Sequence, residues 1–125
     1  MKFIIRFFIL CSLGISLNSL AMGYSKDYET CMKSVQNQMV TISTCQEKEY
    51  KVQNKRMKKN YKEKLSILSN SEKSMFKQVH NNWLKQRDQV CGLEKNKSQL
   101  LNANFKECYL QVTMSRADML EYGLK

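Results

Sequence analysis

The sequence predicts an all-α fold, a small disulfide-stapled helical bundle built on an antiparallel helical hairpin with a third packing helix. Three observations support this prediction. The 125-residue chain has no proline and only four glycines, and the part after residue 21 is rich in Lys, Gln, Leu, Met and Glu, which favour helix. Apolar residues recur at spacings of three and four, the period of a helix. Four cysteines after residue 21 supply the staples.

Residues 1–21 have the three-part layout of a secretory signal peptide. The basic residues Lys2 and Arg6 precede an apolar run over residues 7–17, and small residues occupy the −3 and −1 positions of a cut after Ala21. A transmembrane anchor is the alternative, but the apolar run is shorter than the roughly 20 residues that a span requires. We therefore predict cleavage near Ala21.

The mature chain is expected to be a single domain over residues 22–125, periplasmic or secreted, with no transmembrane span. An even number of cysteines in a short exported chain is typical of a disulfide framework, and counting leaves all three pairings open. No two of these cysteines have the ligand spacing of a zinc site, so we predict no metal and no cofactor. The cysteines of the mature chain are Cys31, Cys45, Cys91 and Cys108.

The mature chain is strongly basic. Removal of Lys2 and Arg6 leaves 19 Lys and Arg against 11 Asp and Glu, and 19 − 11 gives a net charge of +8. Such a surface favours anionic partners, for example lipid headgroups or acidic cell-wall polymers. An exported protein seldom meets nucleic acid, so we predict no nucleic-acid partner, and a merely soluble lysine-rich surface is the simpler interpretation.

The first expected helix follows Ser25, and its pattern weakens over residues 37–41. On one straight helix Cys31 and Cys45 would lie about 21 Å apart. A disulfide permits a Cα separation of only about 4–7 Å. If these two cysteines pair, the helix must break between them.

The helical period returns at residue 42 and continues to residue 68. The apolar stripe expected here consists of Ile42, Cys45, Tyr50, Met57, Tyr61, Leu65 and Leu68. The other side is a basic face, which includes Lys48, Lys51, Lys55, Arg56, Lys58, Lys59, Lys62 and Lys64. A basic amphipathic helix can dock on an anionic membrane. We favour packing on a core, because the stripe contains Tyr and Met rather than a broad Leu, Phe and Trp face.

Ser69 and Glu72 fit a capping box, which predicts that one helix ends near residue 68 and another begins near residue 71. The almost absent loop predicts the helical hairpin. The second arm is expected to present one apolar side, made of Phe76, Val79, Trp83, Val90 and Cys91, and to stop or kink at Gly92.

A last helix is expected after a cap within residues 96–99, with a stop at Gly123. Its apolar residues at helical spacing are Leu101, Phe105, Cys108, Val112, Met119 and Leu120. A turn over residues 92–97 would let the chain fold back, so that Cys91 and Cys108 can approach each other.

The order of short motifs along the chain resembles a known family. The motifs are Cys31, Cys45-x3-Glu49-Tyr50, Met57, Tyr61, Trp83-x3-Arg87-Asp88-x2-Cys91 and Cys108-x4-Thr113-x2-Arg116-Ala117-x2-Leu120. Together they are similar to the small exported helical domain named after the N-terminal region of the lysozyme inhibitor LprI. The resemblance implies an all-helical fold, bridges Cys31–Cys45 and Cys91–Cys108, and binding to a lysozyme-type glycosidase.

Trp83, Arg87 and Asp88 are the strongest candidates for a site. Residues 83 and 87 are one helical turn apart, so the guanidinium can lie over the indole ring. Asp88 is expected to pair with Arg116 or with a lysine of the first arm. These residues form either a recognition patch or a structural clasp that ties the helices together; the set is Trp83, Arg87, Asp88, Thr113 and Arg116. We favour the clasp because Trp83 lies on the apolar side.

The sequence offers no catalytic constellation, and we predict that the protein is not an enzyme. His80 has no nucleophile or carboxylate at a spacing that implies a partner, so we expect it to be solvated. Glu47, Glu49 and Glu121 could be considered as the paired carboxylates of a glycosidase, but nothing in so small a helical chain suggests a sugar cleft. Two functions remain, namely inhibition of a lysozyme-type glycosidase and binding of anionic envelope lipid or polymer by the basic helix. For the first, a negative patch of Glu47, Glu49, Glu72 or Asp88 would have to override like-charge repulsion from a basic lysozyme.

Overall fold

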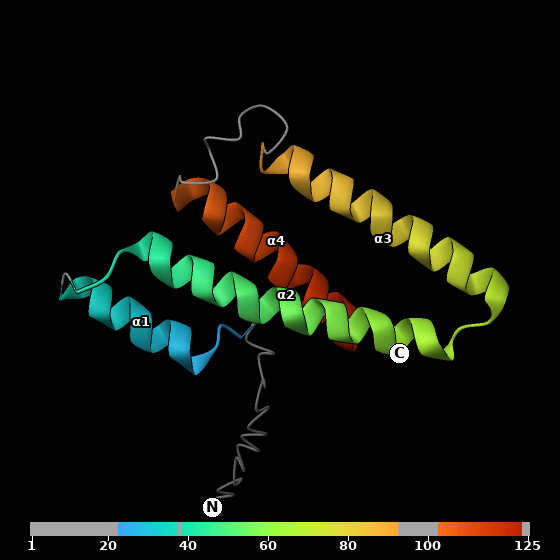
Figure 1. Cartoon of the computed structure of the whole chain (residues 1–125), viewed down its shortest axis with the longest axis horizontal. Helices are drawn as coiled ribbons and strands as arrows, with labels where there is room; N and C mark the ends of the chain where they lie inside the picture. The colour runs from blue at the N-terminus through green and yellow to red at the C-terminus, as the bar shows by residue number, and fades with distance from the viewer. Residues whose placement is uncertain (1–22, 38, 93–102, 124–125) are drawn as a thin grey trace, which may run out of the picture.

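The structure, a computed structural model, describes residues 23–37, 39–92 and 103–123 as four helices (Figure 1). These are α1 Lys26–Gln36, α2 Ile42–Ile67, α3 Asn70–Val90 and α4 Ala103–Tyr122. No strand occurs in the described ranges, which confirms the all-α class. The predicted signal peptide, the cap within residues 96–99 and Leu101 lie outside these ranges.

Side-chain caps determine where the first two helices begin. The Ser25 hydroxyl accepts a hydrogen bond from the Tyr28 N–H at 3.1 Å at the start of α1. The Thr41 hydroxyl accepts from the Thr44 N–H at 3.2 Å at the start of α2. Such caps satisfy backbone donors that have no partner within the helix. The helix therefore breaks between residues 36 and 42, where the sequence pattern weakens.

The predicted capping box is present at the start of α3. The Glu72 carboxylate accepts from the Ser69 N–H at 2.8 Å and from its hydroxyl at 2.5 Å. These hydrogen bonds hold the pKa of Glu72 below its ordinary value. Helix α2 ends at Ile67 and α3 begins at Asn70, so the hairpin connection is as short as predicted.

The hairpin arms α2 and α3 diverge, and α4 lies between them (Figure 1). The most extensive helix contact is between α2 and α4, while α3 contacts α4 less extensively. Contacts of Glu47 with Lys106 and of Arg56 with Asp118 show that α2 and α4 run parallel. Helix α1 runs antiparallel along the N-terminal half of α2. The third packing helix thus connects the two arms of the hairpin.

The apolar core lies where α2 and α4 meet near the hairpin. Met57, Ala117 and Leu120 are buried there, and Tyr61, Phe76 and Trp83 pack against them. Helix α4 supplies most of the buried apolar residues, which are Phe105, Leu110, Met114, Ala117 and Leu120. Removal of these apolar side chains from water stabilises the fold.

The buried face of α2 differs from the predicted apolar stripe. Cys45 and Met57 are buried as expected, but Ile42 is 44% exposed. The face also contains four buried polar residues, Gln46, Glu49, Gln53 and Asn60. An apolar pattern misses them because α2 lies between α1 and α4, whose polar groups can bond to its side chains. For example, the Asn60 amide donates to the Ala117 carbonyl at 3.3 Å.

The inner face of α3 also differs from prediction. Val79 and Val90 are 49% and 74% exposed, whereas His80 and Arg87 are buried. The expectation of a solvated histidine was wrong. Because α4 presents aromatic and polar side chains toward α3, flat and cationic side chains pack there in place of valine.

Two disulfides join neighbouring helices. Cys31 pairs with Cys45 between α1 and α2, and Cys91 pairs with Cys108 between the end of α3 and α4. The Cα atoms are 5.7 Å apart in both. This is the pairing that the family resemblance implies. After Cys91 the backbone of Gly92 has a φ of 79°, a conformation that favours glycine, as the predicted stop requires.

Candidate functional site

A stack of aromatic and cationic side chains joins the three long helices. Its centre is Arg87 on α3, whose guanidinium carbon lies 4.0 Å from the centre of the Tyr109 ring and 5.2 Å from that of Trp83. Both distances are within the range of a cation–π interaction. The Tyr109 ring also lies 5.2 Å from Tyr50 on α2. The predicted placement of Arg87 over Trp83 is confirmed, and Tyr109 is an additional partner.

His80 extends the stack toward the hairpin. Its ring lies 4.0 Å from Tyr61 on α2 and 5.6 Å from Trp83. The Arg116 guanidinium carbon of α4 lies 5.5 Å from the centre of the Trp83 ring. Burial, together with the positive charges of Arg116 and Arg87, holds the pKa of His80 below its ordinary value. A neutral imidazole therefore packs between the two rings.

Asp88 pairs differently from the prediction. Its carboxylate accepts from the Arg87 guanidinium at 3.1 Å and from the Tyr109 hydroxyl at 2.8 Å. Neither Arg116 nor a lysine of α2 contacts it among the described residues. Burial and the bond to Asp88 raise the pKa of Tyr109, so the phenol stays a donor. The reason for the difference is that α4 places an aromatic ring, and no cation, opposite Asp88.

Thr113 and Arg116 lie on the inner side of α4. Thr113 is fully buried, and Arg116 is 6% exposed. The Arg116 Nη1 donates to the Met119 sulfur at 3.5 Å. With Trp83 partly buried and Arg87 buried, most of the predicted set lies inside the bundle and offers little surface to a partner.

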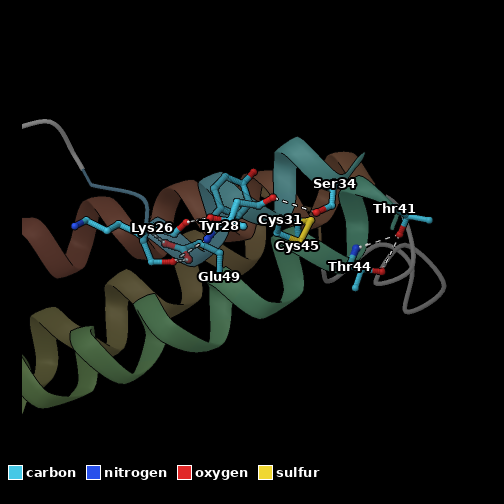
Figure 2. The surroundings of a disulfide bond; sticks show 10 residues. Lys26, Tyr28, Cys31, Ser34, Thr41, Thr44, Cys45 and Glu49 are labelled. Carbon is cyan, nitrogen blue, oxygen red and sulfur yellow. Dashed lines mark hydrogen bonds between the residues drawn. A yellow bond between two sulfur atoms is a disulfide. The ribbon is translucent and has the colours of Figure 1, made fainter. Parts of the chain in front are cut away.

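A buried polar cluster docks α1 onto α2 beside the Cys31–Cys45 bridge, and Figure 2 shows Glu49 next to the bridge. The Glu49 carboxylate accepts from the Ser25 N–H at 2.8 Å and from its hydroxyl at 2.5 Å. The Gln53 amide donates to Glu49 at 2.7 Å and to the Gly23 carbonyl at 3.2 Å. The carboxylate thus bonds to the start of α1, where the helix dipole favours a negative charge.

The lysines of the predicted basic face are exposed along α2, except for the half-buried Lys64. Lys51 pairs with Glu47 at 3.3 Å and Lys59 with Glu63 at 3.8 Å, both in exposed i,i+4 pairs. In the part of the chain that the structure describes, no carboxylate pairs with Lys48, Lys55, Lys58 or Lys62. Several of these lysines line a shallow groove of about 570 Å³ with Asn54 between them.

Arg56 was assigned to the basic face, and this part of the prediction was wrong. Its guanidinium pairs with Asp118 and lies 3.6 Å from the Glu121 carboxylate, both on α4. Arg56 is therefore turned toward α4 and joins the two parallel helices. One turn further along α2, Asn60 also bonds to Glu121 at 3.3 Å.

The four acidic residues that a negative patch would need are separated. Glu49 is buried against Ser25, and Asp88 is bonded to Tyr109. Glu47 pairs with Lys51 and with Lys106 at 3.2 Å, and these cations hold its pKa below the ordinary value. Glu72 caps α3. The folded chain therefore has no acidic surface built from these residues.

An apolar groove of about 310 Å³ opens between the first half of α3 and the last turns of α4. Its apolar lining consists of Leu68, Met75, Phe76, Val79, Met119 and Leu120. Arg116 and Glu72 also line it. Sequence patterning did not indicate this groove, because it forms where one face of α3 meets one face of α4, and their meeting is decided by the tertiary structure.

In residues 23–37, 39–92 and 103–123, no three His, Cys, Asp or Glu side chains are grouped so as to hold a metal ion. Over the same ranges, no helix has the length and apolar character needed to cross a bilayer.

The fold and the two bridges define a class, the small disulfide-bonded helical domain of an oxidising compartment. The model of the family described as "Lysozyme inhibitor LprI" matches residues 31–120. The chain belongs to the LprI lysozyme inhibitor family. No curated protein and no solved structure matches it.

Proposed function

We propose that the mature chain is an exported, non-catalytic protein that binds and blocks a lysozyme-type glycosidase. The observation that carries the proposal is the family match over residues 31–120. Two disulfides suit export to the periplasm or the medium, and the expected signal peptide over residues 1–21 would direct it there.

The clasp residues would serve such an inhibitor by holding the helices in one arrangement. Arg87 and Tyr109 join α3 to α4, and the Cys91–Cys108 bridge lies close by. A surface that is ordered before binding loses less conformational entropy in the complex. In this proposal Trp83, Arg87, Asp88, Thr113 and Arg116 position α3, and exposed side chains contact the enzyme.

The positive charge of the protein limits which glycosidases it would bind. With a net charge of +8 for residues 22–125 (19 − 11), approach to a strongly basic lysozyme is opposed by repulsion. Glu47, Glu49, Glu72 and Asp88 do not form a patch that would reverse this. The proposal therefore favours a glycosidase whose docking surface is neutral or acidic.

Lysis of cell-wall suspensions by a set of lysozymes with different isoelectric points tests the proposal. We expect the oxidised mature protein to slow lysis at micromolar concentration, most strongly for the less basic enzymes. Reduced and alkylated protein is the matched control, because its charge is nearly unchanged while its fold is destabilised. No inhibition of any enzyme, or equal inhibition by the control, would contradict the proposal.

A second candidate function is binding of an anionic cell-wall polymer by the basic face. Lys48, Lys55, Lys58 and Lys62 are exposed and have no carboxylate partner in the described part of α2 and its neighbours. Insertion of α2 into lipid is disfavoured, because its inner face packs on α4 and α1. A polymer that follows the row of lysines needs no apolar contact.

The triple variant Lys55→Glu, Lys58→Glu, Lys62→Glu tests the polymer proposal. We expect salt-sensitive binding of the parent protein to a polyphosphate-backbone polymer and at least tenfold weaker binding of the variant. The control variant carries the same charge change at the exposed residues Lys33, Lys77 and Lys85. Equal weakening in both variants would mean that net charge, and no defined face, causes binding.

An uncharged oligosaccharide substrate separates the two functions. A protein that blocks the glycosidase slows hydrolysis of this substrate as well as lysis of cell walls. A protein that only coats the anionic wall slows lysis alone.

A further inference from the structure

The apolar groove between α3 and α4 contains a buried cation. Its volume of about 310 Å³ is at the lower end of the range for small-molecule pockets, and its lining is mainly apolar. Met75 and Val79 of α3 are 66% and 49% exposed at this groove. Arg116 lines the same groove although it is only 6% exposed.

Arg116 differs from the other arginines of the described chain. Arg56 pairs with Asp118, and Arg87 pairs with Asp88. No carboxylate pairs with Arg116 in residues 23–37, 39–92 or 103–123, and its Nε has no hydrogen-bond partner there. A buried guanidinium without an anionic partner is costly, so an incoming anion would gain both charge pairing and hydrogen bonds.

The charges around the groove favour an anion beside Arg116. The Arg116 guanidinium carbon lies 5.5 Å from the centre of the Trp83 ring, which stacks on neutral His80, and Nη1 donates to the Met119 sulfur. Glu72, also at the groove, is bonded to the N–H and hydroxyl of Ser69 at the start of α3. Its carboxylate stays charged, but these bonds hold it at the helix terminus, and it does not pair with Arg116.

We propose that this groove binds a carboxylate amphiphile with a single alkyl chain. The carboxylate accepts hydrogen bonds from Arg116, and the chain lies against Met75, Val79 and Met119. The almost complete burial of Arg116 favours a slender headgroup over the broad surface of a protein. The mainly apolar lining favours a ligand with an alkyl chain that can pack against it. This site is independent of the proposed inhibition of a glycosidase.

Trp83 is the only tryptophan of the chain and lies beside Arg116, so its fluorescence can report binding. Decanoate is the probe, and decanol, which has the same chain length without the charge, is the matched control ligand. We expect a saturable fluorescence change and a heat of binding with decanoate below its micelle concentration. Decanol should bind about tenfold more weakly or worse, because it lacks the charge-assisted hydrogen bonds.

Three variants place the ligand in the groove. Arg116→Gln should reduce decanoate binding to the level of decanol. Val79→Asp puts a charge on the exposed wall and should weaken both ligands at least tenfold. Val90→Asp is the control, because residue 90 is exposed on the same helix outside the groove. Circular dichroism checks that each variant is folded.

Several outcomes would overturn the proposal. These are the absence of both a heat and a fluorescence change with decanoate, equal affinity for decanoate and decanol, or equal effects of Val79→Asp and Val90→Asp. If Arg116→Gln does not fold, the comparison of the two ligands and the two valine variants still decides the question. The assay contains no glycosidase, so its result does not depend on whether the protein inhibits one.

Discussion

The Tyr109 hydroxyl donates a hydrogen bond of 2.8 Å to the Asp88 carboxylate, and so connects α4 to α3. The same ring carries the Arg87 guanidinium at 4.0 Å, and Arg87 itself bonds to Asp88. Three side chains therefore form a closed group beside the Cys91–Cys108 bridge. The contact between α3 and α4 is less extensive than the contact between α2 and α4. We therefore expect this group to contribute much of the attachment of α3 to α4.

Replacement of the hydroxyl tests that attachment. Tyr109→Phe keeps the ring beneath Arg87 but removes the donor to Asp88. We expect the free energy of unfolding to fall by about 1–2 kcal/mol, because a partly buried carboxylate loses a hydrogen bond. Urea unfolding monitored by circular dichroism measures it. Tyr122→Phe, at an exposed tyrosine of the same helix, should change stability by less than about 0.5 kcal/mol, and equal losses would contradict the assignment.

Glu49→Gln tests the docking of α1. An amide at this position loses the charge and part of the capacity to accept from Ser25 and Gln53, so we expect a loss of about 1–3 kcal/mol. Amide exchange in α1 should rise first, because the cluster connects α1 to α2. Glu47→Gln, an exposed carboxylate half a turn away, is the control. The assignment fails if the two variants behave alike.

His80→Phe tests the neutral state of the buried imidazole. The pKa of His80 is lowered by burial and by Arg116 and Arg87, so the unfolded chain binds a proton more readily than the folded one. The stability due to neutral His80 is therefore complete above pH about 6.5 and is lost as pH falls through the lowered pKa.

His80 is the only histidine, so the pH comparison is direct. Urea unfolding of the parent protein should show lower stability at pH about 5.5 than at about 7.5. His80→Phe keeps a ring between Tyr61 and Trp83 and should show a smaller change. The same pH dependence in both proteins would assign the effect to other groups.

Removal of each bridge should have a separate local effect. The pairs Cys31→Ser, Cys45→Ser and Cys91→Ser, Cys108→Ser open loops of sequence separation 14 and 17. Each double variant should lose about 3 kcal/mol of stability in the entropic account of disulfides. Amide exchange should rise in α1 for the first and at the end of α3 for the second. Exchange that rises equally everywhere would contradict separate roles for the bridges.

Local signals predicted the helix boundaries well. The Ser69–Glu72 box marked the start of α3, because both of its hydrogen bonds form between residues three apart. The weakened helical pattern over residues 37–41 likewise marked the break before α2, because it reflects residues that are close in sequence. Such contacts depend on neighbours in sequence, so the sequence is sufficient to locate them.

Patterning was less informative about burial. It placed Ile42, Val79 and Val90 inside the fold and left Glu49, Asn60 and His80 outside, whereas the structure has the reverse. These three buried polar residues have a hydrogen-bond or stacking partner elsewhere in the fold, namely Ser25 for Glu49, Ala117 for Asn60 and Tyr61 for His80. The polar residues Gln46, Glu49, Gln53 and Asn60 do recur at helical spacing, a signal that hydropathy alone ignores.

The sequence by itself determined the helical class, the cysteine framework and the family, because composition, spacing and motif order require no knowledge of contacts between helices. Only the tertiary structure decided that α4 lies between the hairpin arms, that Arg56 faces α4 and that Arg116 lines an apolar groove without a carboxylate partner in the described ranges. The physical reason is that burial of a polar group depends on the partner it meets. That partner comes from a different helix, more than 20 residues away in each of the contacts joining Tyr109 to Asp88 and Arg56 to Asp118.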